Sequence, residues 1–443
     1  MNSLKLYPAS RLRGRIVLPA SKSISARALI VNALSRSTLL PENLSDSDDT
    51  RAMLEGLRTL SNSPLKGENL AADKAHPFRE HRGGTLDIGA AGTAMRFLTA
   101  YLSVTPGEYV ITGSERMKHR PISILADALR KLGAGIAYEG EEGFPPLRIK
   151  GRTDLEGGSL TVPGNVSSQY VSALLMIAPT LKRGLRLTLT GEIASRPYLD
   201  MTMSMMRDFG AQAEWQGNDV IEVQPGSYRQ RPYHIESDWS AASYWYEMVA
   251  VSTDPNAEIE LVGLHRNSIQ GDSRVWQMFG QLGVVTEFFA EPDGTEIVRI
   301  RKGGDTTCHF SCDFTHQPDL AQTLTVTCAL LDVPFHLHGL QSLRIKETDR
   351  IAALRTELRK LGIDIKEEGE STLCWDGTRC KAEPKPVFDT YDDHRMAMSL
   401  APVCLRPAQT IRMNNPEVVS KSYPAYWQDL GKAGFKMVRN KEL

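Results

Sequence analysis

Cysteine is scarce in this sequence and is confined to its C-terminal half. The six cysteines begin at Cys308, and no two of them form a CxxC pair. Their spacing does not match the known zinc-binding patterns, and a chain of 443 residues needs no disulfide to stabilise its core. We therefore expect reduced, mostly buried thiols, a cytoplasmic protein and no metal.

Long apolar runs and an excess of charge of one sign are also missing. No stretch approaches the roughly 18 consecutive apolar residues of a membrane-spanning helix, and the start, MNSLKLYPASRLRG, has no apolar run of signal-peptide length. The sequence has 52 Lys and Arg against 53 Asp and Glu, for a formal net charge of -1. This balance gives no global attraction to nucleic acid or to an anionic membrane. Any anion-binding site must therefore come from local clustering of basic side chains.

What the sequence does contain is a repeated unit. An amphipathic helix, a hydrophobic residue followed by glycine, and an alternating pair of strands recur about every 75 residues. The glycines that end these helices are Gly133, Gly210, Gly283, Gly362 and Gly434. Each lies where a helix C-terminus favours a left-handed residue. A first copy, RAMLEGLRTLSNSP, lacks the glycine and completes a set of six units, which suggests two domains of three small α/β units each.

Basic residues and prolines stand at the starts of several of these helices. They are Arg120-Pro121, Arg196-Pro197, Lys346, and Lys421 with Pro424. A helix N-terminus already carries partial positive charge. Cations at matching repeat positions therefore indicate that anions bind where the helices converge. The chain is expected to cross between domains near residues 20 and 235, and the polar segment 61–85 is expected to be a surface excursion of the first unit.

Two segments near the N-terminus suit a phosphorylated ligand. KSISAR places Lys22, Ser23 and Arg27 at the start of a helix, although a Ser-capped, solvated helix start is the alternative. LDIGAAGTAMRFL predicts a strand, a glycine-rich turn and a helix, in which Gly89 and Gly92 would let a ligand approach the backbone. The alternative there is an ordinary turn. The segment is not a P-loop, because the Lys-Ser/Thr pair is missing.

A third segment, VPGNVSSQYVSALLM, opens a helix with Ser167, Ser168 and Gln169. Hydroxyl and amide groups at a helix N-terminus can hold an oxyanion. A serine N-cap with no further role is the alternative.

The segment LRIKETDRIAALRTELRKLG contains Lys346, Glu347 and Arg350. Lys346 and Arg350 are spaced i, i+4 and are expected to share one helix face, with Glu347 one step round. A salt-bridged surface helix is the alternative. A glutamate among cations ionises easily, yet it could act as an acid if it shares protons with a bound phosphate or enol carbon.

Two further segments carry acids and histidines. THQPDLAQTLTV contains His316 and Asp319, and TYDDHRMAMSLAP contains Asp392, Asp393, His394 and Arg395. A metal site from these residues is disfavoured, because no second cluster has ligand spacing. An anion site built on the His-Arg pair at a helix start is the favoured interpretation.

The basic residues of these segments add up to a set that one ligand pair could use. They are Lys22, Arg27, Arg120, Lys346, Arg350, Arg395 and Lys421, and we expect each at the start of a helix. Seven cations would suit two phosphates and two carboxylates, which together carry about −5 to −6.

Taken together, these segments resemble the EPSP synthase family of enolpyruvyl transferases. The motifs KSxSxR, GTAMR, RMKxRPI, SSQ, SxPY, PD, KETDR, DHRMAM and SK occur in the family's order over nearly the whole chain. The resemblance implies an α/β fold, a two-domain inside-out α/β barrel in which each domain has three βαβαββ repeats around a pseudo-threefold axis. It implies one domain from residues 1–20 plus 235–443 and another from residues 21–234, with the active site in a cleft between them that closes on the substrates.

The resemblance also implies which residues bind the substrates. For shikimate 3-phosphate they are Lys22, Ser23, Arg27, Ser167, Ser168, Gln169, Ser195, Tyr198, Asp319, Ser342 and Lys346. For phosphoenolpyruvate they are Lys22, Gly92, Arg120, Gln169, Arg350, Arg395 and Lys421.

The implied chemistry is addition followed by elimination. Asp319 matches the proposed base for the 5-hydroxyl of shikimate 3-phosphate, and Glu347, with Lys22, matches the proposed acid at the methylene carbon of phosphoenolpyruvate. No metal or organic cofactor is implied. The implied partners are the two small substrates, with no nucleic acid and no membrane, and we expect a monomer.

The sequence departs from common family residues at four positions. Ala26, Ala90 and Phe97 stand where Asn, Asn and Pro are common, and Ser342 stands where Asn often contacts the shikimate phosphate. Serine can still donate a hydrogen bond there. We expect Phe97 to change the packing behind the phosphoenolpyruvate pocket, which leaves sensitivity to glyphosate open.

Three other functions were weighed. The sister enzyme that modifies UDP-N-acetylglucosamine typically carries a cysteine in the loop that here reads GSERMKHRPIS, and it lacks the KSxSxR pattern. A non-catalytic binding protein with the same repeat would tolerate loss of Asp319 and Glu347, and both are present. An RNA-end cyclase is disfavoured by the near-neutral charge and the missing nucleotide motif.

Overall fold

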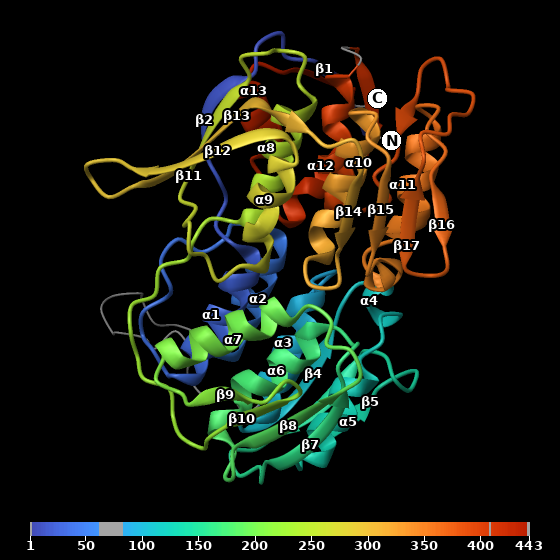
Figure 1. The fold of residues 1–443 in the computed structure, drawn as a ribbon. Coiled ribbons are helices and arrows are strands. Elements are labelled where there is room, and N and C mark those ends of the chain that lie inside the picture. The colour runs from blue at the N-terminus through green and yellow to red at the C-terminus, as the bar shows by residue number, and fades with distance from the viewer. Residues whose placement is uncertain (1, 62–82, 407–408, 441–443) are drawn as a thin grey trace. The chain divides into compact units, whose positions relative to one another are not determined.

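The computed structural model describes residues 2–61, 83–406 and 409–440 and divides into two compact units. Unit 1 comprises Met1–Ala20 and Glu236–Leu443, and unit 2 comprises Ser21–Ile235 (Figure 1). The N-terminal segment therefore belongs with the C-terminal half, and unit 2 is inserted into unit 1. None of the described helices is long and apolar enough to cross a membrane.

The described residues of unit 2 form two four-stranded sheets of identical topology. In spatial order their strands are β3 (Gly83–Asp87), β4 (Gly107–Thr112), β6 (Leu147–Gly151) and β5 (Gly135–Tyr138), then β7 (Gly158–Pro163), β8 (Leu185–Thr190), β10 (Val220–Val223) and β9 (Ala213–Gln216). In both sheets the first pair is parallel and the next two pairs are antiparallel. The parallel pair requires a crossover connection, which a helix supplies.

Unit 1 repeats this pattern in three further sheets of described residues. Their strands are β2 (Arg13–Val17), β11 (Glu258–Val262), β13 (Glu296–Thr306) and β12 (Leu282–Ala290); β14 (Phe310–Asp313), β15 (Phe335–His338), β17 (Thr372–Trp375) and β16 (Lys366–Glu368); and β18 (Val387–Phe388), β19 (Ile411–Asn414), β1 (Ser3–Tyr7) and β20 (Lys436–Asn440). The N-terminal strands β1 and β2 thus complete two sheets whose other strands come from the second half of the chain.

The helices connect the strands of each repeat. In unit 2 they are α1 (Lys22–Leu34), α2 (Asp48–Ser61), α3 (Gly92–Ser103), α4 (Glu115–Lys118), α5 (Ser123–Lys131), α6 (Ser168–Ile177) and α7 (Arg196–Asp208). In unit 1 they are α8 (Trp239–Val251), α9 (Val275–Gly280), α10 (Ala321–Leu330), α11 (Arg350–Arg359), α12 (His394–Leu400) and α13 (Tyr426–Lys432). Short 3-10 helices are η1 (Ala178–Thr180), η2 (Gly271–Arg274), η3 (Pro318–Leu320), η4 (Gln341–Ile345), η5 (Ala401–Cys404) and η6 (Pro416–Lys421).

Helices, rather than sheets, form the centre of each unit. Every residue of α10 is buried, and so is every residue of α6 from Tyr170 to Ile177. A helix that is apolar on all sides has to be surrounded by protein. Accordingly, α6 packs against α1, α3 and α7 in unit 2, and α10 packs against α8, α11 and α12 in unit 1. The expected inside-out α/β arrangement with βαβαββ repeats is therefore present, as in β3–α3–β4–α5–β5–β6.

The predicted helix-ending glycines are confirmed at four of the five repeats. Gly133, Gly210, Gly362 and Gly434 follow helices and have φ of 100°, 88°, 79° and 101°. At α5 the amide of Gly133 donates to Arg130 O and that of Ala134 to Leu129 O, which is the Schellman pattern. The same pair of bonds recurs after α7, α11 and α13.

The prediction for Gly283 was wrong in its location. Helix α9 ends at Gly280, and Gly283 lies inside β12, where the register with β13 shifts between Leu282 and Val284. Its φ is again positive, at 84°. A left-handed glycine at this place forms a bulge in a strand instead of a helix cap.

The first repeat is the least regular of the six. It contributes α1 and α2, together with a single parallel bridge between Glu42 and His234. Of the segment 61–85 that was expected to be a surface excursion, residues 62–82 lie outside the described residues, and residues 83–85 begin strand β3. That part of the prediction was wrong, because Gly83 to Asp87 pair in parallel with β4.

Two glycines at the end of α13 test the left-handed cap. A Cβ on Gly434 would combine a φ of 101° with a 3.1 Å approach to the backbone oxygen of Arg11. We expect Gly434→Ala to lower the free energy of unfolding by about 1–2 kcal/mol. Gly431, three residues earlier in the helix, would meet only the flexible end of Met437 at 3.5 Å. Gly431→Ala should be neutral or stabilising by up to about 1 kcal/mol. Urea denaturation of both variants measures the difference, and equal losses would contradict the cap.

Candidate active site

Four helix N-termini of unit 2 carry the residues predicted to bind anions. Lys22 is the first residue of α1, whose N-cap is Ser21, and Gly92 is the first residue of α3. Ser167 caps α6, and its hydroxyl accepts from the amide of Gln169 at 3.4 Å. Ser195 precedes α7. These four predicted helix starts are therefore confirmed, and Ser21 is the N-cap of α1.

Ser195 has an unusual backbone conformation. Its φ and ψ are 55° and 37°, in the left-handed region, and it makes no side-chain cap bond to α7. A non-glycine residue there costs on the order of 1 kcal/mol or more, and such strain is concentrated at functional sites. Pro197 lies in the first turn of α7, whereas Pro121 and Pro424 precede α5 and α13.

Arg27 is a buried cation held by neutral groups of unit 2. It is 2% exposed, and its Nε donates to Thr202 Oγ1 at 2.7 Å. Its other nitrogens donate to Ser172 Oγ and to the carbonyl of Ser23, both at 3.0 Å. Burial lowers the pKa of Arg27 to about 10, so it stays charged at neutral pH. This guanidinium joins α1 to α6 and α7 and is compensated by dipoles, which favours an incoming anion.

Two aromatic rings flank Arg27. Its Cζ lies 5.3 Å from the centre of the Phe97 ring and 5.6 Å from that of Tyr198. Phe97 is completely buried on α3. In the structure Phe97 therefore packs on a residue implied to bind shikimate 3-phosphate.

The remaining predicted residues of unit 2 lie around the start of α3. The guanidinium of Arg120 packs on Gly92 so closely that a Cβ there would lie 2.5 Å from its Nη1. The side-chain amide of Gln169 donates to Thr93 Oγ1 at 3.0 Å, which links α6 to α3. Lys22 Nζ lies 3.2 Å from Asp49 of α2, an acidic residue that the sequence analysis did not single out.

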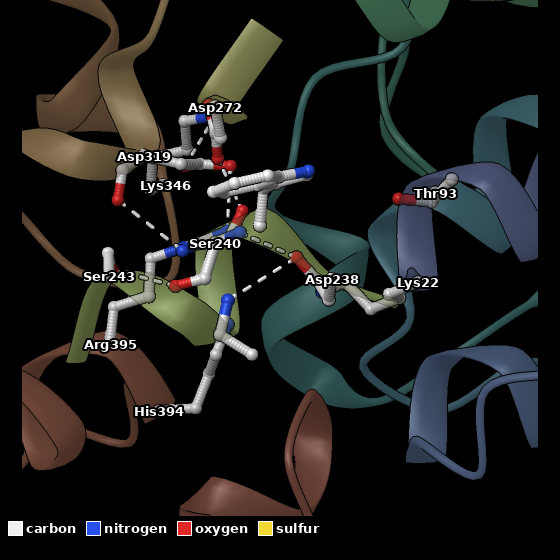
Figure 2. Close-up of polar contacts among 12 residues, drawn as sticks. Lys22, Thr93, Asp238, Ser240, Ser243, Asp272, Asp319, Lys346, His394 and Arg395 are labelled. Carbon is white, nitrogen blue, oxygen red and sulfur yellow. Dashed lines mark hydrogen bonds and ion pairs between the residues drawn. The ribbon is translucent and has the colours of Figure 1, made fainter. Parts of the chain in front are cut away.

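In unit 1 the structure brings six predicted residues into one network of ion pairs. The carboxylate of Asp319 accepts from Arg395 Nη2 at 2.9 Å (Figure 2). It also accepts from Arg350 Nη1 at 3.2 Å. Lys346 Nζ lies 3.8 Å from the same carboxylate. Glu347 accepts from Arg350 at 2.9 Å and lies 3.3 Å from Lys421 Nζ.

Asp393 holds Arg350, the central arginine of this network, in place. It is fully buried, and it accepts from Arg350 Nε at 2.6 Å and Nη2 at 3.3 Å, which is a bidentate pair. It also caps α12 by accepting from the amide of Arg395 at 2.9 Å. Asp393 was considered above only as a metal ligand. Its position immediately before a helix is the sequence signal for a cap.

Asp272 is a second acid that sequence analysis missed. It is 3% exposed in η2 and accepts a hydrogen bond from the Ser240 hydroxyl (Figure 2). Its Oδ1 has no hydrogen-bond partner among the described residues. Burial, the negative charge of Asp319 and that of Asp238 raise the pKa of Asp272 to about 7, against the lowering effect of Arg395 and Ser240. No pattern in the sequence near Asp272 indicated this.

The cations decide the charge of Asp319. Burial alone would raise the pKa of Asp319, but Arg395, Lys346 and Arg350 hold it well below its ordinary value. Burial lowers the pKa of Lys346, against the opposing effect of Asp319. Burial likewise acts to lower the pKa of Arg350, but Asp393, Glu347 and Asp319 raise it above its ordinary value. Asp319 and Arg350 are therefore both charged at neutral pH.

One local prediction in this region was wrong. Lys346 and Arg350 do not share a helix face, because α11 begins only at Arg350. Asp349 is its N-cap and accepts from the amides of Ile351 and Ala352, both at 3.1 Å. Lys346 instead follows η4, and from there it reaches Asp319.

Other predicted helix starts also differ in detail. Arg27 lies within α1, Arg120 lies between α4 and α5, and Lys421 ends η6. Ser342 lies in η4 and makes no hydrogen bond to the acidic and basic network among the described residues.

Comparison with known proteins identifies the family. The model of the family described as EPSP synthase (3-phosphoshikimate 1-carboxyvinyltransferase) matches residues 6–430. A 3-phosphoshikimate 1-carboxyvinyltransferase of Bacteroides fragilis is 54% identical over 97% of this chain and 97% of its own. One of Sulfurovum sp. is 36% identical over 97% of this chain and 99% of its own.

A solved structure supports the fold. The EPSP synthase of Acinetobacter baumannii superposes with a TM-score of 0.79 and covers 100% of both chains at 23% identity. At that identity the likeness shows the two-domain α/β fold alone. With the family model matched over most of its length and relatives similar over nearly all of it, the chain belongs to the EPSP synthase family.

Proposed function

We propose that this protein transfers the enolpyruvyl group of phosphoenolpyruvate to the 5-hydroxyl of shikimate 3-phosphate, and releases inorganic phosphate. The product is 5-enolpyruvylshikimate 3-phosphate, a precursor of chorismate and the aromatic amino acids in the shikimate pathway. The observation that carries this proposal is the network in which Asp319 and Glu347 are held on Lys346, Arg350, Arg395 and Lys421. It places two carboxylates that can exchange protons among cations that can hold phosphates.

The charges support a pair of anionic substrates. Two phosphates and two carboxylates carry about −5 to −6. Unit 2 supplies Lys22, Arg27 and Arg120, and unit 1 supplies the four cations of the network. We propose that both sets bind one pair of substrates in a cleft between the units, and that closure excludes water and strengthens these interactions.

The residues divide between the two substrates as the family resemblance implies. Shikimate 3-phosphate would be held by Lys22, Ser23, Arg27, Ser167, Ser168, Gln169, Ser195, Tyr198, Asp319, Ser342 and Lys346. Phosphoenolpyruvate would be held by Lys22, Gly92, Arg120, Gln169, Arg350, Arg395 and Lys421. The unusual backbone of Ser195 and the neutral partners of Arg27 support their assignment.

Asp319 is the proposed base, and its surroundings explain how binding would activate it. In the free protein three cations stabilise its charge, so it binds a proton weakly. Anionic substrates that share Arg395, Arg350 and Lys346 would withdraw part of this stabilisation. The basicity of Asp319 would then rise when the 5-hydroxyl is in place, which confines proton removal to the loaded site.

The proposed reaction proceeds through a tetrahedral ketal phosphate. Glu347, with Lys22, protonates the methylene carbon of phosphoenolpyruvate while the 5-oxygen, deprotonated by Asp319, bonds to its central carbon. In the second step the carbon–oxygen bond to phosphate breaks and the new methyl group loses a proton, which restores the double bond. The protein supplies orientation and a fixed positive field.

We propose that the enzyme acts as a cytoplasmic monomer without a cofactor. Both proposed substrates are multiply charged and do not cross a membrane unaided, so the enzyme belongs in the compartment that makes them. The addition forms one carbon–oxygen bond, and the elimination breaks another and releases phosphate. The proton transfers that accompany these two steps can be supplied by the side chains named above.

The proposed reaction is tested by the requirement for both substrates. Purified protein should release inorganic phosphate from phosphoenolpyruvate only when shikimate 3-phosphate is added, as a colorimetric phosphate assay measures. UDP-N-acetylglucosamine is the control acceptor and should give no release. Release with that acceptor, and none with shikimate 3-phosphate, would refute the proposal.

The role of Glu347 is tested by Glu347→Gln. The amide keeps the size of the side chain and can still accept from Arg350, but it cannot exchange a proton at neutral pH. We expect kcat to fall by at least about 100-fold, as for the loss of acid–base catalysis. Glu370→Gln, an exposed exchange of the same type in unit 1, should leave kcat unchanged. A Glu347→Gln enzyme with near-normal kcat would remove Glu347 from the mechanism.

The protonation of Asp272 predicts how stability depends on pH. Because its pKa is raised from 3.8 to about 7, the folded state binds a proton that the unfolded state releases. This contribution is complete below about pH 4 and is lost as pH rises to about 7. Relative to Asp272→Asn, the wild type should lose more than about 1 kcal/mol over this range, measured by urea denaturation without ligands.

Asp293→Asn is the control of opposite sign. Hydrogen bonds from Thr295 lower the pKa of the exposed Asp293, so the wild type should gain stability relative to this variant as pH rises through the acid range. Parallel pH profiles for the wild type and Asp272→Asn would show that Asp272 is ionised throughout.

A further inference from the structure

Arg96 is a buried arginine of α3 to which the proposed reaction gives no role. It belongs to the GTAMR segment and is 4% exposed. Its Nη1 donates to the carbonyl of Gly92 at 3.1 Å and approaches Met117 Sδ at 3.7 Å. Its Nη2 donates to the carbonyl of Pro121 at 3.0 Å. Burying a guanidinium is costly, and these charge-assisted hydrogen bonds offset that cost only while the backbone stays in place.

The contacts of Arg96 surround the segment that carries Arg120. Met117 and Pro121 stand on either side of Arg120 in the chain, and the amide of Arg120 donates to the carbonyl of Met117 at 3.0 Å. Gly92 is the residue on which the Arg120 guanidinium packs, with 2.5 Å between Nη1 and the place of a Cβ. One guanidinium therefore holds both the backbone next to Arg120 and the surface on which Arg120 lies.

Tyr170 of α6 supports the same arrangement. Its hydroxyl donates to the carbonyl of Pro121 at 2.5 Å, and its ring centre lies 5.8 Å from Arg96 Cζ. The neighbouring Gln169 is bonded to Thr93 of α3. The N-terminal ends of α3 and α6 and the segment 117–121 are thus held together by side chains that donate to the carbonyls of Gly92 and Pro121 and to the Thr93 hydroxyl.

We infer that Arg96 is a positioning residue for the binding of phosphoenolpyruvate: it holds Arg120 in register with Gly92 without touching the substrate. This inference rests on the proposed function, in which Arg120 and Gly92 contact phosphoenolpyruvate. A bidentate or closely packed guanidinium has to be placed to within a fraction of an ångström to bind an anion well. Arg96 provides this placement from the buried side.

The test is the response of the two Michaelis constants to Arg96→Lys. Lysine keeps the positive charge, but a single ammonium group cannot replace the fork that reaches the carbonyls of Gly92 and Pro121 together. We expect the KM for phosphoenolpyruvate to rise by about tenfold or more, a change of about 1.4 kcal/mol. The KM for shikimate 3-phosphate should stay within about twofold.

Tyr170→Phe is the second variant and removes only one donor to the carbonyl of Pro121. It should raise the KM for phosphoenolpyruvate by about two- to fivefold, in the same direction as Arg96→Lys. Arg130→Lys is the matched control, because Arg130 also donates to a backbone carbonyl, that of Ile136 at 3.0 Å, and lies 4.8 Å from the ring centre of Tyr138. It should leave both KM values unchanged.

The outcomes separate a positioning role from a general structural one. Unchanged KM for phosphoenolpyruvate in folded Arg96→Lys, or an equal rise in both KM values, would overturn the inference. If Arg96→Lys does not fold, Tyr170→Phe decides: a selective rise supports the inference, and no rise overturns it. A wild-type protein that releases no phosphate with both substrates present would overturn the proposed function, and this inference with it.

Discussion

The buried ion pair between Arg350 and Asp393 is the interaction on which the acidic and basic network of unit 1 depends. Both side chains are excluded from solvent, and the pair is bidentate, with 2.6 Å between Arg350 Nε and the carboxylate. Removing one partner of such a pair leaves an uncompensated buried charge, which costs about 3–5 kcal/mol. Because Asp393 fixes one edge of the guanidinium, Nη1 of Arg350 faces Asp319, and Nη2, which also donates to Asp393, faces Glu347.

This arrangement also explains why acids occur among the cations of the proposed anion-binding site. The charges of Arg350 and Arg395 are compensated by Asp319 and Glu347, so these buried cations have acidic partners within the network. An incoming phosphate or carboxylate would exchange places with these acids as a partner. The two acids that would be displaced, Asp319 and Glu347, are those that we propose exchange protons. Substrate binding would therefore also activate these two acids. In unit 2, neutral hydroxyls and carbonyls play the same compensating part for Arg27.

Much of the fold was predictable because it repeats. Glycine often follows a helix because it adopts the left-handed conformation without strain, and four of the glycines identified from the sequence end their helices as expected. Gly283 shows the limit of that reasoning, since a left-handed glycine serves a bulge as well as a cap. The prediction that Lys346 and Arg350 share a helix face was wrong because i, i+4 spacing has meaning only within a helix. The capping bonds of Asp349 begin the helix at Arg350, so Lys346 lies outside it.

The candidate site was predicted less completely than the fold. Motif residues near helix starts were found, because the sequence marks both the charge and the helix. Sequence patterns did not place three acids in the site: Asp49, Asp272 and Asp393. Asp49 and Asp393 belong to it because of a cation distant in sequence, and Asp272 because of its burial. Lys22 and Asp49 are separated by 27 residues, and Arg350 and Asp393 by 43. Burial and long-range pairing are properties of the folded chain, and local patterns carry little information about them.

The insertion of unit 2 has a consequence for how the chain is made. Strand β1 pairs with β19 and β20, which are synthesised only after the whole of unit 2. Unit 2 is continuous in sequence, so all of its residues are available while the ribosome is still adding the second half. Strand β1 leaves the ribosome before unit 2 and must therefore wait, unpaired, until β19 and β20 have been synthesised. Completion of this sheet is tied to the synthesis of those two strands, and a chain that stops before them leaves β1 with an open edge.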